Sequence, residues 1–600
     1  MQCSQIPTSK RRSLLSILAP HGKQESTNRT QKAHFGLSSQ TMAADSLRCE
    51  SYEQAMMRYA QRRTITPVLS WHTLALATIF LAGFVLRLYG LGSESLWFDE
   101  MWSFRTARME PLQILFSTPR DNNPPLYYLI LHYWMLIAGD SEFIVRLPSA
   151  IAGALAIPVI YGIGSMLVSR STGLIAALIL SLSAYHLRYS QEARAYSLMV
   201  FLGLASFYFL LKLLEERRSW TATAGYVAFT TLLMYSHVYG IFLVGAQLLY
   251  LLATRQDLRR WVVPAAFVAL LYVPGVARIA VNLLFPQGAW KSGGMGWLPE
   301  PTFANVVDFF VLYSGSLPLV IAFVLLATFG LVELVRSKQG STACLLLAWL
   351  LVPIVVPFVV SHLYRPMLLD RYTIAASPAL YLLVARGVEG LRSTKYSRVL
   401  VHARILLALG VIVFSLAAAL DYYAATTKEP WREVAGYVEA HAKPGDLILF
   451  YGGSGKYMFG YYFEREDVTQ EVATVDSSPP VTWKETREGL APVVEGHRRV
   501  WLVRHWADDP HINKLLSRTL VNLSDGVAYH RVYNERIDDP YRNWSTWYFQ
   551  DHIVVFLFAE RKNPITETGH NVIPRPESTR GSGRTPQCDS SHRWRAQRCR

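Results

Sequence analysis

The sequence predicts a polytopic α-helical membrane protein, with about 11–13 transmembrane helices and a small soluble α/β domain near the C-terminal end. Of the 600 residues, 51% are hydrophobic and only 17% are charged, whereas a soluble chain carries about 25% charged residues. Long apolar runs follow one another from residue 71 to residue 423. From about residue 426 the pattern changes to short amphipathic helices and strands.

The net charge of +15 is concentrated at the two ends of the chain. Residues 1–64 carry ten Lys and Arg against four acids, and residues 563–600 carry seven Arg against three acids. Both segments lack hydrophobic periodicity, so we expect disordered basic extensions over 1–64 and 562–600. No basic stripe with interleaved aromatic residues occurs between them, and nucleic acid is therefore not an expected partner. The five cysteines form no CxxC pair, which indicates neither a zinc site nor a disulfide framework.

The first expected span covers residues 71–91, and Arg58, Arg62 and Arg63 precede it. Positive charge before a first span favours a cytoplasmic N-terminus. The segment 92–123 then lies on the outer side, and its mixture of aromatic, apolar and charged residues suits helices that lie along the interface. We therefore expect a multi-pass inner-membrane protein of the cell envelope, with its polar site on the extracytoplasmic side.

Further apolar runs complete an expected transmembrane domain over residues 65–425. They lie at about 124–138, 145–168, 172–190, 196–215, 220–236, 238–254, 261–285, 305–336, 343–361, 372–389 and 401–423. The run at 124–138 has about 15 residues, short of the ~20 that a full span needs. The Gly-rich loop at 286–302 suits either a mobile flap over a site or an interfacial loop anchored by its tryptophans.

An extracytoplasmic α/β domain is expected over residues 426–561. Pro430–Val438 has the pattern of an amphipathic helix, and Leu447–Tyr451, Val500–Val503 and His552–Phe558 have the composition of strands. Helices that alternate with strands are typical of a small α/β fold.

Polar residues at the edges of the apolar runs are the candidates for chemistry. Asp99 and Glu100 stand among aromatic residues where the first span should meet water. Acids at a membrane face are costly unless they are hydrated, paired or used. In an apolar setting such a carboxylate can act as general base on an acceptor hydroxyl. An ordinary pair of solvated interfacial acids is the plainer alternative.

Other polar residues interrupt the apolar background further along the chain. Glu192 and Arg194 lie at the junction of two apolar runs, and His237 lies between two others. Arg371 opens a late run, and its planar fork suits two oxygens of a phosphate. The alternatives are a charged loop, a helix-end polar residue and a membrane anchor, respectively. Walker, Rossmann, HExxH and GxSxG patterns do not occur in the sequence.

Several short motifs occur in an order that is known from one superfamily. They are Trp97-Phe98-Asp99-Glu100, Asn123-Pro124-Pro125-Leu126-Tyr127-Tyr128, Arg146-Leu147-Pro148-Ser149, Ser190-Gln191-Glu192-Ala193-Arg194-Ala195-Tyr196 and Arg371-Tyr372. Over about residues 70–425 the chain resembles the bacterial membrane glycosyltransferases of the GT-C superfamily. The branch is that of the protein O-mannosyltransferases and aminoarabinose transferases, family 39. That family often has His where Asn123 stands.

The resemblance implies an inverting glycosyltransferase that moves a sugar from a polyprenyl-phosphate donor in the bilayer to the hydroxyl of an extracytoplasmic protein, lipid or glycan. It implies Asp99 as the base with Glu100 as its neighbour, and Arg371 at the lipid phosphate. The other expected substrate-binding residues are Asn123, Tyr127, Glu192, Arg194, Tyr196 and His237. No cofactor is certain, and use of a divalent cation stays open.

Two other functions remain possible at this level. Charges at the membrane also suit a lipid or solute transporter or a flippase, although transporters usually carry internal repeats, and none is visible here. An oligosaccharide ligase is the second.

The placement of Glu192 is also open: if 124–138, 145–168 and 172–190 all cross, Asp99 and Glu192 end on opposite faces. Either the short run does not cross, which its length favours, or the Glu192 stretch does not join the site.

Overall fold

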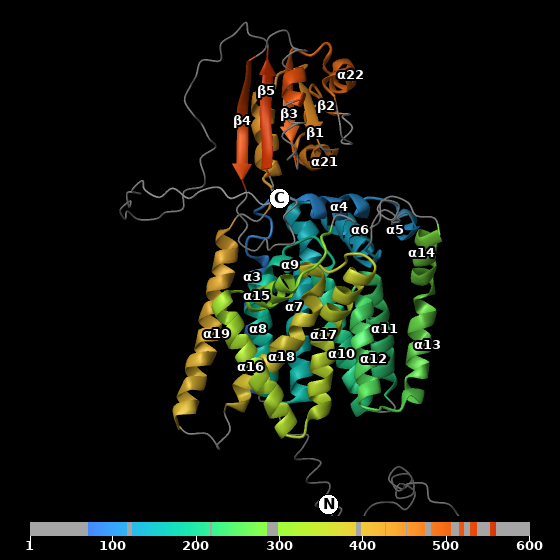
Figure 1. The fold of residues 1–600 in the computed structure, drawn as a ribbon, viewed down its shortest axis with the longest axis vertical. Coiled ribbons are helices and arrows are strands. Elements are labelled where there is room, and N and C mark those ends of the chain that lie inside the picture. Colours follow the sequence, from blue (N-terminus) through green and yellow to red (C-terminus); the bar gives the residue numbers. More distant parts are fainter. Residues whose placement is uncertain are drawn as a thin grey trace, which may run out of the picture. The chain divides into compact units, whose positions relative to one another are not determined.

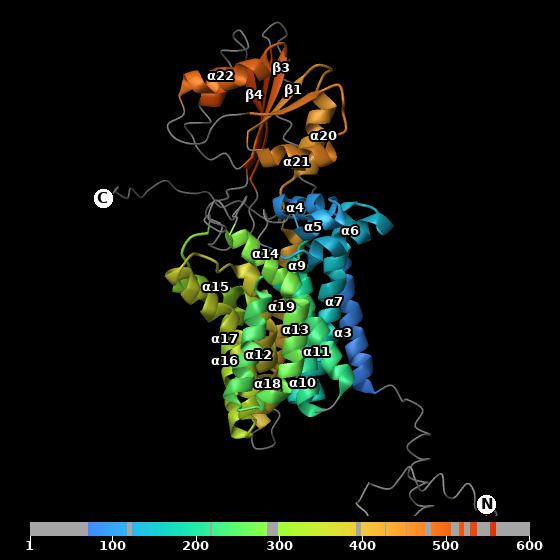
Figure 2. The same cartoon turned by 90° about the vertical axis from the view of Figure 1, so that its right-hand side faces the viewer.

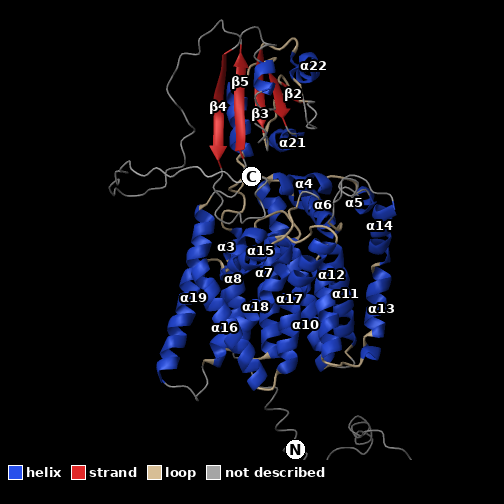
Figure 3. Ribbon diagram, viewed as in Figure 1, coloured by secondary structure: helices blue, strands red, loops and turns tan. Residues whose placement is uncertain are grey.

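The computed structural model describes residues 70–116, 123–216, 219–284, 298–391, 398–425, 428–451, 453–473, 482–505, 515–520, 528–536 and 552–559 (Figure 1). The expected extensions over 1–64 and 562–600 lie outside the described residues, as does most of the Gly-rich loop, 286–297. Within the described part, helices fill the chain up to α19, and every strand lies beyond it (Figure 3).

The helical region consists of the helices from α3 to α19. They are α3 (Trp71–Leu88), α4 (Phe98–Ala107), α5 (Pro111–Phe116), α6 (Leu126–Ala138), α7 (Glu142–Leu167), α8 (Arg170–Leu182), α9 (Ala184–Ser190), α10 (Tyr196–Glu215), α11 (Trp220–Ser236), α12 (Gly240–Ala253), η3 (Leu258–Arg260), α13 (Val262–Leu271), α14 (Val273–Leu284), α15 (Phe303–Ser314), α16 (Leu317–Arg336), α17 (Gly340–Leu363), η5 (Asp370–Ala376), α18 (Ser377–Gly390) and α19 (Arg398–Ala424). Helices α7, α10, α16, α17 and α18 run side by side (Figure 1).

Six of the described helices are long and apolar enough to cross a membrane: α3, α7, α10, α16, α17 and α19. The number becomes seven if α13 and α14, which meet at a bend of 50°, count as one broken span. The expectation of 11–13 spans also counted shorter apolar runs, which form helices such as α8 and α12 of 13 and 14 residues. The chain is a multi-pass membrane protein.

Exposed apolar side chains mark the surface that faces lipid. On α16, Leu317, Ile321 and Leu325 are 67%, 63% and 65% exposed, and they follow one another at intervals of four residues. This spacing places them on one face of the helix. A contiguous apolar surface of this kind is what a bilayer covers.

Close backbone contact joins α16 to α18. A Cβ at Gly330 would lie 2.2 Å from the carbonyl oxygen of Leu383, and one at Gly387 would lie 2.1 Å from that of Leu326. Only glycine permits such an approach, and small residues at helix crossings are a common way to pack helices in membranes.

The short proline-led run forms a helix that is shorter than the hydrocarbon core of a bilayer is thick. It forms α6, whose 13 residues span about 20 Å, against the ~30 Å of a hydrocarbon core. Gly139 ends α6 with a φ of 91°, a left-handed conformation that favours glycine. The imidazole Nδ1 of His132 lies 2.7 Å from the carbonyl oxygen of Ala107 and holds α6 against α4. α6 therefore lies against α4, which is the arrangement expected if this run does not cross.

The α/β domain consists of α20 (Trp431–His441), β1 (Leu447–Tyr451), α21 (Gly453–Tyr462), β2 (Thr469–Val472), α22 (Trp483–Val494), β3 (Arg499–Arg504), β4 (Ala528–Arg536) and β5 (His552–Ala559). The five strands form one mixed sheet in the order β2-β1-β3-β5-β4. Strand β1 pairs in parallel with β2 and β3, and β5 pairs antiparallel with β3 and β4. The buried runs of β1 and β3 reflect coverage of both faces of the sheet.

The α/β domain shares a hydrophobic core with α4 and α6. Met101, Phe104 and Tyr127 from the helical region belong to the same cluster of buried residues as Trp431 and Phe459 from the domain. The rings of Phe104 and Tyr461 meet edge to face, with centroids 5.1 Å apart. Figure 2 shows α21 beside α4. The expectation of an α-helical membrane protein with a small α/β domain is confirmed.

Candidate active site

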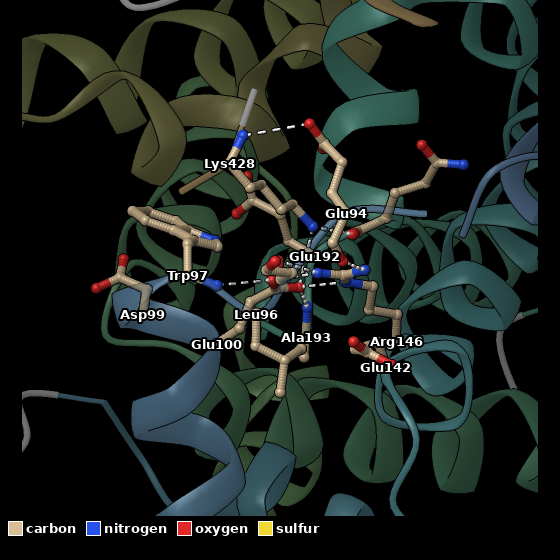
Figure 4. A network of polar contacts seen from close by, with 12 residues as sticks. Glu94, Leu96, Trp97, Asp99, Glu100, Glu142, Arg146, Glu192, Ala193 and Lys428 are labelled. Atoms are coloured by element: carbon tan, nitrogen blue, oxygen red, sulfur yellow. Dashed lines mark hydrogen bonds and ion pairs between the residues drawn. The ribbon is translucent and has the colours of Figure 1, made fainter. Parts of the chain in front are cut away.

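Two adjacent acids begin the site on the first turn of α4. Successive residues on a helix point about 100° apart, so the carboxylates of Asp99 and Glu100 face different surroundings. Figure 4 shows the Glu100 side chain inside a network of polar contacts and the Asp99 side chain directed away from it. The two acids therefore have separate roles, which the sequence could not distinguish.

Glu100 is completely buried and fully hydrogen-bonded. Its two oxygens accept bonds of 2.8 Å each from Nε and Nη2 of Arg146, in the bidentate geometry of a strong ion pair. Nζ of Lys428 lies 3.1 Å from Oε1, and the backbone N–H of Ala193 donates to the same oxygen at 2.9 Å. Burial by itself would raise the pKa of Glu100, but the charges of Arg146 and Lys428 outweigh it and lower the pKa to about 2. Glu100 is thus an ionised anchor. Its lone pairs are all engaged, so none is available to take a proton from another group.

Arg146 fixes the loop before α4 as well as Glu100. Its Nη1 donates to the carbonyl oxygens of Leu91 and Glu94 at 2.9 and 2.8 Å, and its Nη2 donates to that of Ser95 at 2.8 Å. One guanidinium on α7 therefore sets the direction from which the chain enters α4.

Asp99 faces Arg371 instead. Its Oδ2 lies 3.3 Å from Nη2 of Arg371, and both side chains are 16% exposed. The guanidinium lies 6.0 Å from the ring centroid of Trp97 and 5.9 Å from that of Tyr372, within the range of cation–π attraction. Nε of Arg371 is buried and has no hydrogen-bond partner among the described residues. This leaves a cationic donor available beside a carboxylate.

The 3₁₀ segment η5 holds Arg371 in place because side chains from three other helices donate hydrogen bonds to the backbone carbonyl groups of η5. Tyr185 donates to the carbonyl oxygen of Asp370 at 2.7 Å, and Tyr313 donates to that of Thr373 at 2.9 Å. Trp349 donates to that of Ala375 at 2.8 Å. Preorganisation of this kind keeps a charged group in one position while a reaction proceeds.

The stretch that contains Glu192 and Arg194 lies against α4. Nη1 of Arg194 donates to the carbonyl oxygen of Asp99 and to Oγ of Ser103, both at 3.2 Å. Glu192 is buried, 3.5 Å from Nε of Arg188, and burial raises its pKa above the ordinary value despite that charge. The stretch that contains Glu192 therefore joins the site of Asp99.

A hollow beside Asp99 collects most of the remaining candidates. Its lining residues are Ser103, Asn123, Pro124, Tyr127, Tyr128, Arg194, Ala195, Tyr196 and His237. Buried polar atoms without a hydrogen-bond partner among the described residues include Nε1 of Trp97, the hydroxyl of Tyr196 and Nε2 of His237. Buried polar groups normally have partners, so these atoms are suited to hydrogen bonds with a polar ligand.

His237 is a neutral hydrogen-bond donor in this hollow. Burial, together with the charges of Arg194 and Arg371, lowers its pKa to about 3. Its Nδ1 accepts the backbone N–H of Tyr239 at 3.2 Å, which assigns the proton to Nε2. The ring lies between Tyr196 and Tyr372, with centroid distances of 5.7 and 4.9 Å. The result is a fixed N–H that points into an aromatic setting.

Three residues of the site were not among the predicted site residues. Trp97 and Arg146 belong to two of the motifs that carry the family resemblance. The sequence feature that could have identified Arg146 was its charge near the start of an apolar run. Lys428 lies just beyond the expected domain boundary, where nothing in the sequence connects it to Glu100. Among the described residues, no group of three or more His, Cys, Asp or Glu side chains could hold a metal ion.

Comparisons with known proteins agree with the expected resemblance. Residues 122–281 match the family described as dolichyl-phosphate-mannose-protein mannosyltransferase. The crystal structure of ArnT from Cupriavidus metallidurans in the apo state is similar at a TM-score of 0.52 and 13% identity, over 82% of this chain and 98% of that chain. The same protein bound to undecaprenyl phosphate gives 0.51 and 12% over the same shares.

An oligosaccharyltransferase from Archaeoglobus fulgidus in the apo form has a TM-score of 0.48 at 12% identity, over 77% of this chain and 74% of that chain. None of the curated proteins matches the chain. The protein has the ArnT-like fold, and the resemblance to the membrane glycosyltransferases of the GT-C superfamily is confirmed.

Proposed function

We propose that the protein is an inverting glycosyltransferase that moves a sugar from a polyprenyl-phosphate carrier to an acceptor hydroxyl on the extracytoplasmic side of the inner membrane. The observation that carries the proposal is the pair of Asp99 and Arg371, which face each other at 3.3 Å at the end of an ArnT-like helical region. A carboxylate and a guanidinium side by side supply the two charges that such a transfer needs. One accepts a proton, and the other binds a phosphate.

The carrier chemistry is inferred from the fold and from the exposed apolar helices. ArnT was crystallised with undecaprenyl phosphate, and exposed apolar faces such as that of α16 give a lipid tail a place to lie. The buried Nε of Arg371 supplies a free donor for the phosphate oxygens. Trp97 and Tyr372 flank the same guanidinium and limit its contact with water.

The reaction balances with the groups of this chain. The acceptor hydroxyl loses its proton to Asp99, and its oxygen forms a bond to the anomeric carbon. The bond from that carbon to the phosphate oxygen breaks on the opposite face, so the configuration inverts. The electron pair remains on the lipid phosphate, where Arg371 stabilises the charge that develops. Afterwards the protonated Asp99 releases its proton to water.

The sugar would lie against the residues that line the hollow beside Asp99, whose walls must move apart to admit it because the hollow has no room for a water molecule in this structure. Within the hollow, the N–H of His237 would donate to sugar oxygens, and the hydroxyl of Tyr196 can donate or accept. The N–H of Trp97, beside Arg371, is a further donor outside that lining. Asn123 and Tyr127 line the same hollow. Arg194 ties this wall to α4, and Glu192 lies behind it as a buried acid. Hydrogen bonds at fixed positions are what allow a site to select one sugar over another.

Transfer is tested with purified protein in liposomes, radiolabelled polyprenyl-phosphate sugars and a crude envelope fraction as acceptor. We expect label in the acceptor with wild type, and at least a hundredfold slower transfer with Asp99→Asn, which keeps the size of the side chain but cannot take the proton. Unaltered folding of the variant is checked by its detergent-unfolding curve. Transfer near the wild-type rate in Asp99→Asn would refute the assignment of the base. Movement of labelled lipid between leaflets without transfer would replace the proposal with a flippase.

A further inference from the structure

Two adjacent charged residues lie where the helical region leads into the α/β domain, and both are buried. Lys428 is 6% exposed and Glu429 is 0% exposed. Buried ions are costly unless each finds a partner. The two side chains find partners in different parts of the molecule, one in the helical region and the other in the α/β domain.

Lys428 reaches into the helical region. Its Nζ lies 3.1 Å from Oε1 of Glu100 and donates to the carbonyl oxygen of Gln191 at 2.8 Å, and its backbone N–H donates to Oε1 of Glu94 at 3.3 Å (Figure 4). Glu100 already has a bidentate partner in Arg146, so neutralising its charge does not require a second cation. What Lys428 adds is a connection between α4, the stretch before α10 and the start of the α/β domain.

Glu429 reaches into the sheet. Its Oε2 accepts the indole N–H of Trp431 at 2.6 Å, and its Oε1 lies 3.1 Å from Nε2 of His505. His505 directly follows β3, and its backbone N–H bonds the carbonyl oxygen of Tyr451 at the end of β1 at 3.4 Å. Strands β1 and β3 are parallel neighbours. After β1 the chain continues to β2 on one side of this pair, and after β3 it continues to β4 on the other side. In open α/β sheets this switch point is the usual ligand crevice, and here the chain's own carboxylate occupies it.

The helix that carries Asp99 rests on the same domain. The hydroxyl of Tyr462 accepts the backbone N–H of Leu96 at 2.7 Å. The guanidinium of Arg105 lies 3.5 Å from the ring centroid of Tyr457. Both aromatic residues belong to α21, so one end of α4 is held through Glu100 and the other through α21.

We propose that Lys428 and Glu429 form a coupling element through which the α/β domain fixes the orientation of α4. Lys428 is accordingly a positioning residue for Asp99. Glu100 is the next residue after Asp99, and a rotation of α4 that lengthens the contact between Glu100 and Lys428 also moves Asp99 relative to Arg371. This inference rests on the proposed function for its kinetic consequence but not for its structural one.

The test uses the full-length protein with Lys428→Met, which keeps the length of the side chain and leaves the pair of Glu100 and Arg146 intact. A misplacement of about 1 Å in a catalytic group can cost about a hundredfold in rate, so we expect kcat to fall by roughly tenfold to a hundredfold. The KM for the lipid-linked sugar should stay within about twofold because Arg371 lies on η5 and most residues that line the hollow lie outside α4. Lys428→Arg should restore most of the rate. Lys484→Met is the matched control, since it removes an exposed lysine of the same domain that pairs only with Glu488, and it should match wild type.

Hydrogen–deuterium exchange measures the coupling without reference to activity. Lys428→Met should speed exchange of the backbone amides of α4, Phe98–Ala107, and leave α16 and α18 as in wild type. Glu429→Gln perturbs the coupling element from the side of the sheet, because it leaves the side chains of Lys428 and Glu100 unchanged. It should speed exchange in both α4 and β3. Wild-type kcat together with wild-type exchange of α4 in Lys428→Met would overturn the inference. Wild-type protein that transfers no sugar at all would instead overturn the proposed function, and the exchange result would still decide the coupling.

Discussion

Replacing Glu100 by Gln should destabilise the protein strongly, although the two side chains have nearly the same shape. The carboxylate accepts five hydrogen bonds, from Arg146, Lys428 and the backbone N–H groups of Ala193 and Trp97. The amide of Gln can accept at one oxygen only, and it presents an N–H₂ group to two cations. Both cations would then lack a counter-charge in a buried place, which is the costly way to break a buried ion pair.

The size of this effect follows from the pKa of Glu100. The surroundings lower the pKa from 4.5 to about 2, and at about 1.4 kcal/mol per pKa unit this corresponds to about 3 kcal/mol in favour of the folded state. Removal of one partner from a buried pair costs about 3–5 kcal/mol, which agrees. Because the pKa is depressed in the folded state, this stabilisation is complete above pH 4.5 and is lost as the pH falls towards 2.

Free energies of unfolding in mixed micelles, from titration with a denaturing detergent, measure this effect. Wild type should lose about 3 kcal/mol from this group between pH 5 and pH 2, and Glu100→Gln should lack that part of the pH dependence. Asp99→Asn is the natural control, since its partner Arg371 does not belong to the network of Glu100, and it should unfold like wild type. A Glu100→Gln protein within about 1 kcal/mol of wild type at pH 7 would show that the network does not hold α4.

Three further changes address the donor site and the helix packing. Arg371→Lys keeps the charge but loses the planar fork, so we expect the KM for the lipid-linked sugar to rise about tenfold; an unchanged KM would place the phosphate elsewhere. His237→Phe keeps the ring between its aromatic neighbours and removes one neutral donor, so the same KM should rise about threefold to tenfold. Since the pKa of His237 is about 3, the variant should leave the shape of the rate profile between pH 5 and pH 8 as it is in wild type; a change of shape would show that His237 titrates. Gly387→Ala would place a Cβ 2.1 Å from a backbone oxygen of α16 and should cost about 1–3 kcal/mol of stability, measured by detergent titration. Gly436→Ala, with no atom within 4 Å of its Cβ, is its control and should not destabilise.

Much of the architecture could be predicted from composition and periodicity alone. The apolar runs indicated a bundle in the membrane, and the alternation after residue 426 indicated an α/β domain, because both patterns reflect which surface each residue faces. The number of spans was harder. Helices such as α8 and α12 are shorter than a bilayer is thick, and an apolar run does not reveal where its helix ends or how its neighbours cover it.

The candidate site was predictable as a set of residues but not as an arrangement. The motif order brought Asp99, Glu192, Arg194 and Arg371 into consideration together, and the structure places Asp99 against Arg371 and against Arg194. Asp99 and Glu100 could not be distinguished from the sequence, because two adjacent acids look alike until their partners are known. The contact of Lys428 with Glu100 could not be predicted, since a lysine after a long apolar run resembles an ordinary helix-end charge.

The sequence by itself determined that this chain enters a membrane, that its polar residues gather at the ends of apolar runs, and that it resembles the GT-C glycosyltransferases. These properties depend on composition and on local order, which a linear chain carries in full. The tertiary structure decided which acid is buried in an ion network and which pairs with the guanidinium of Arg371. It also decided that α6 lies against α4 and that the α/β domain packs on α4. Such properties depend on contacts between distant residues, whose electrostatic energies are set by burial and distance, and neither is written in the order of residues.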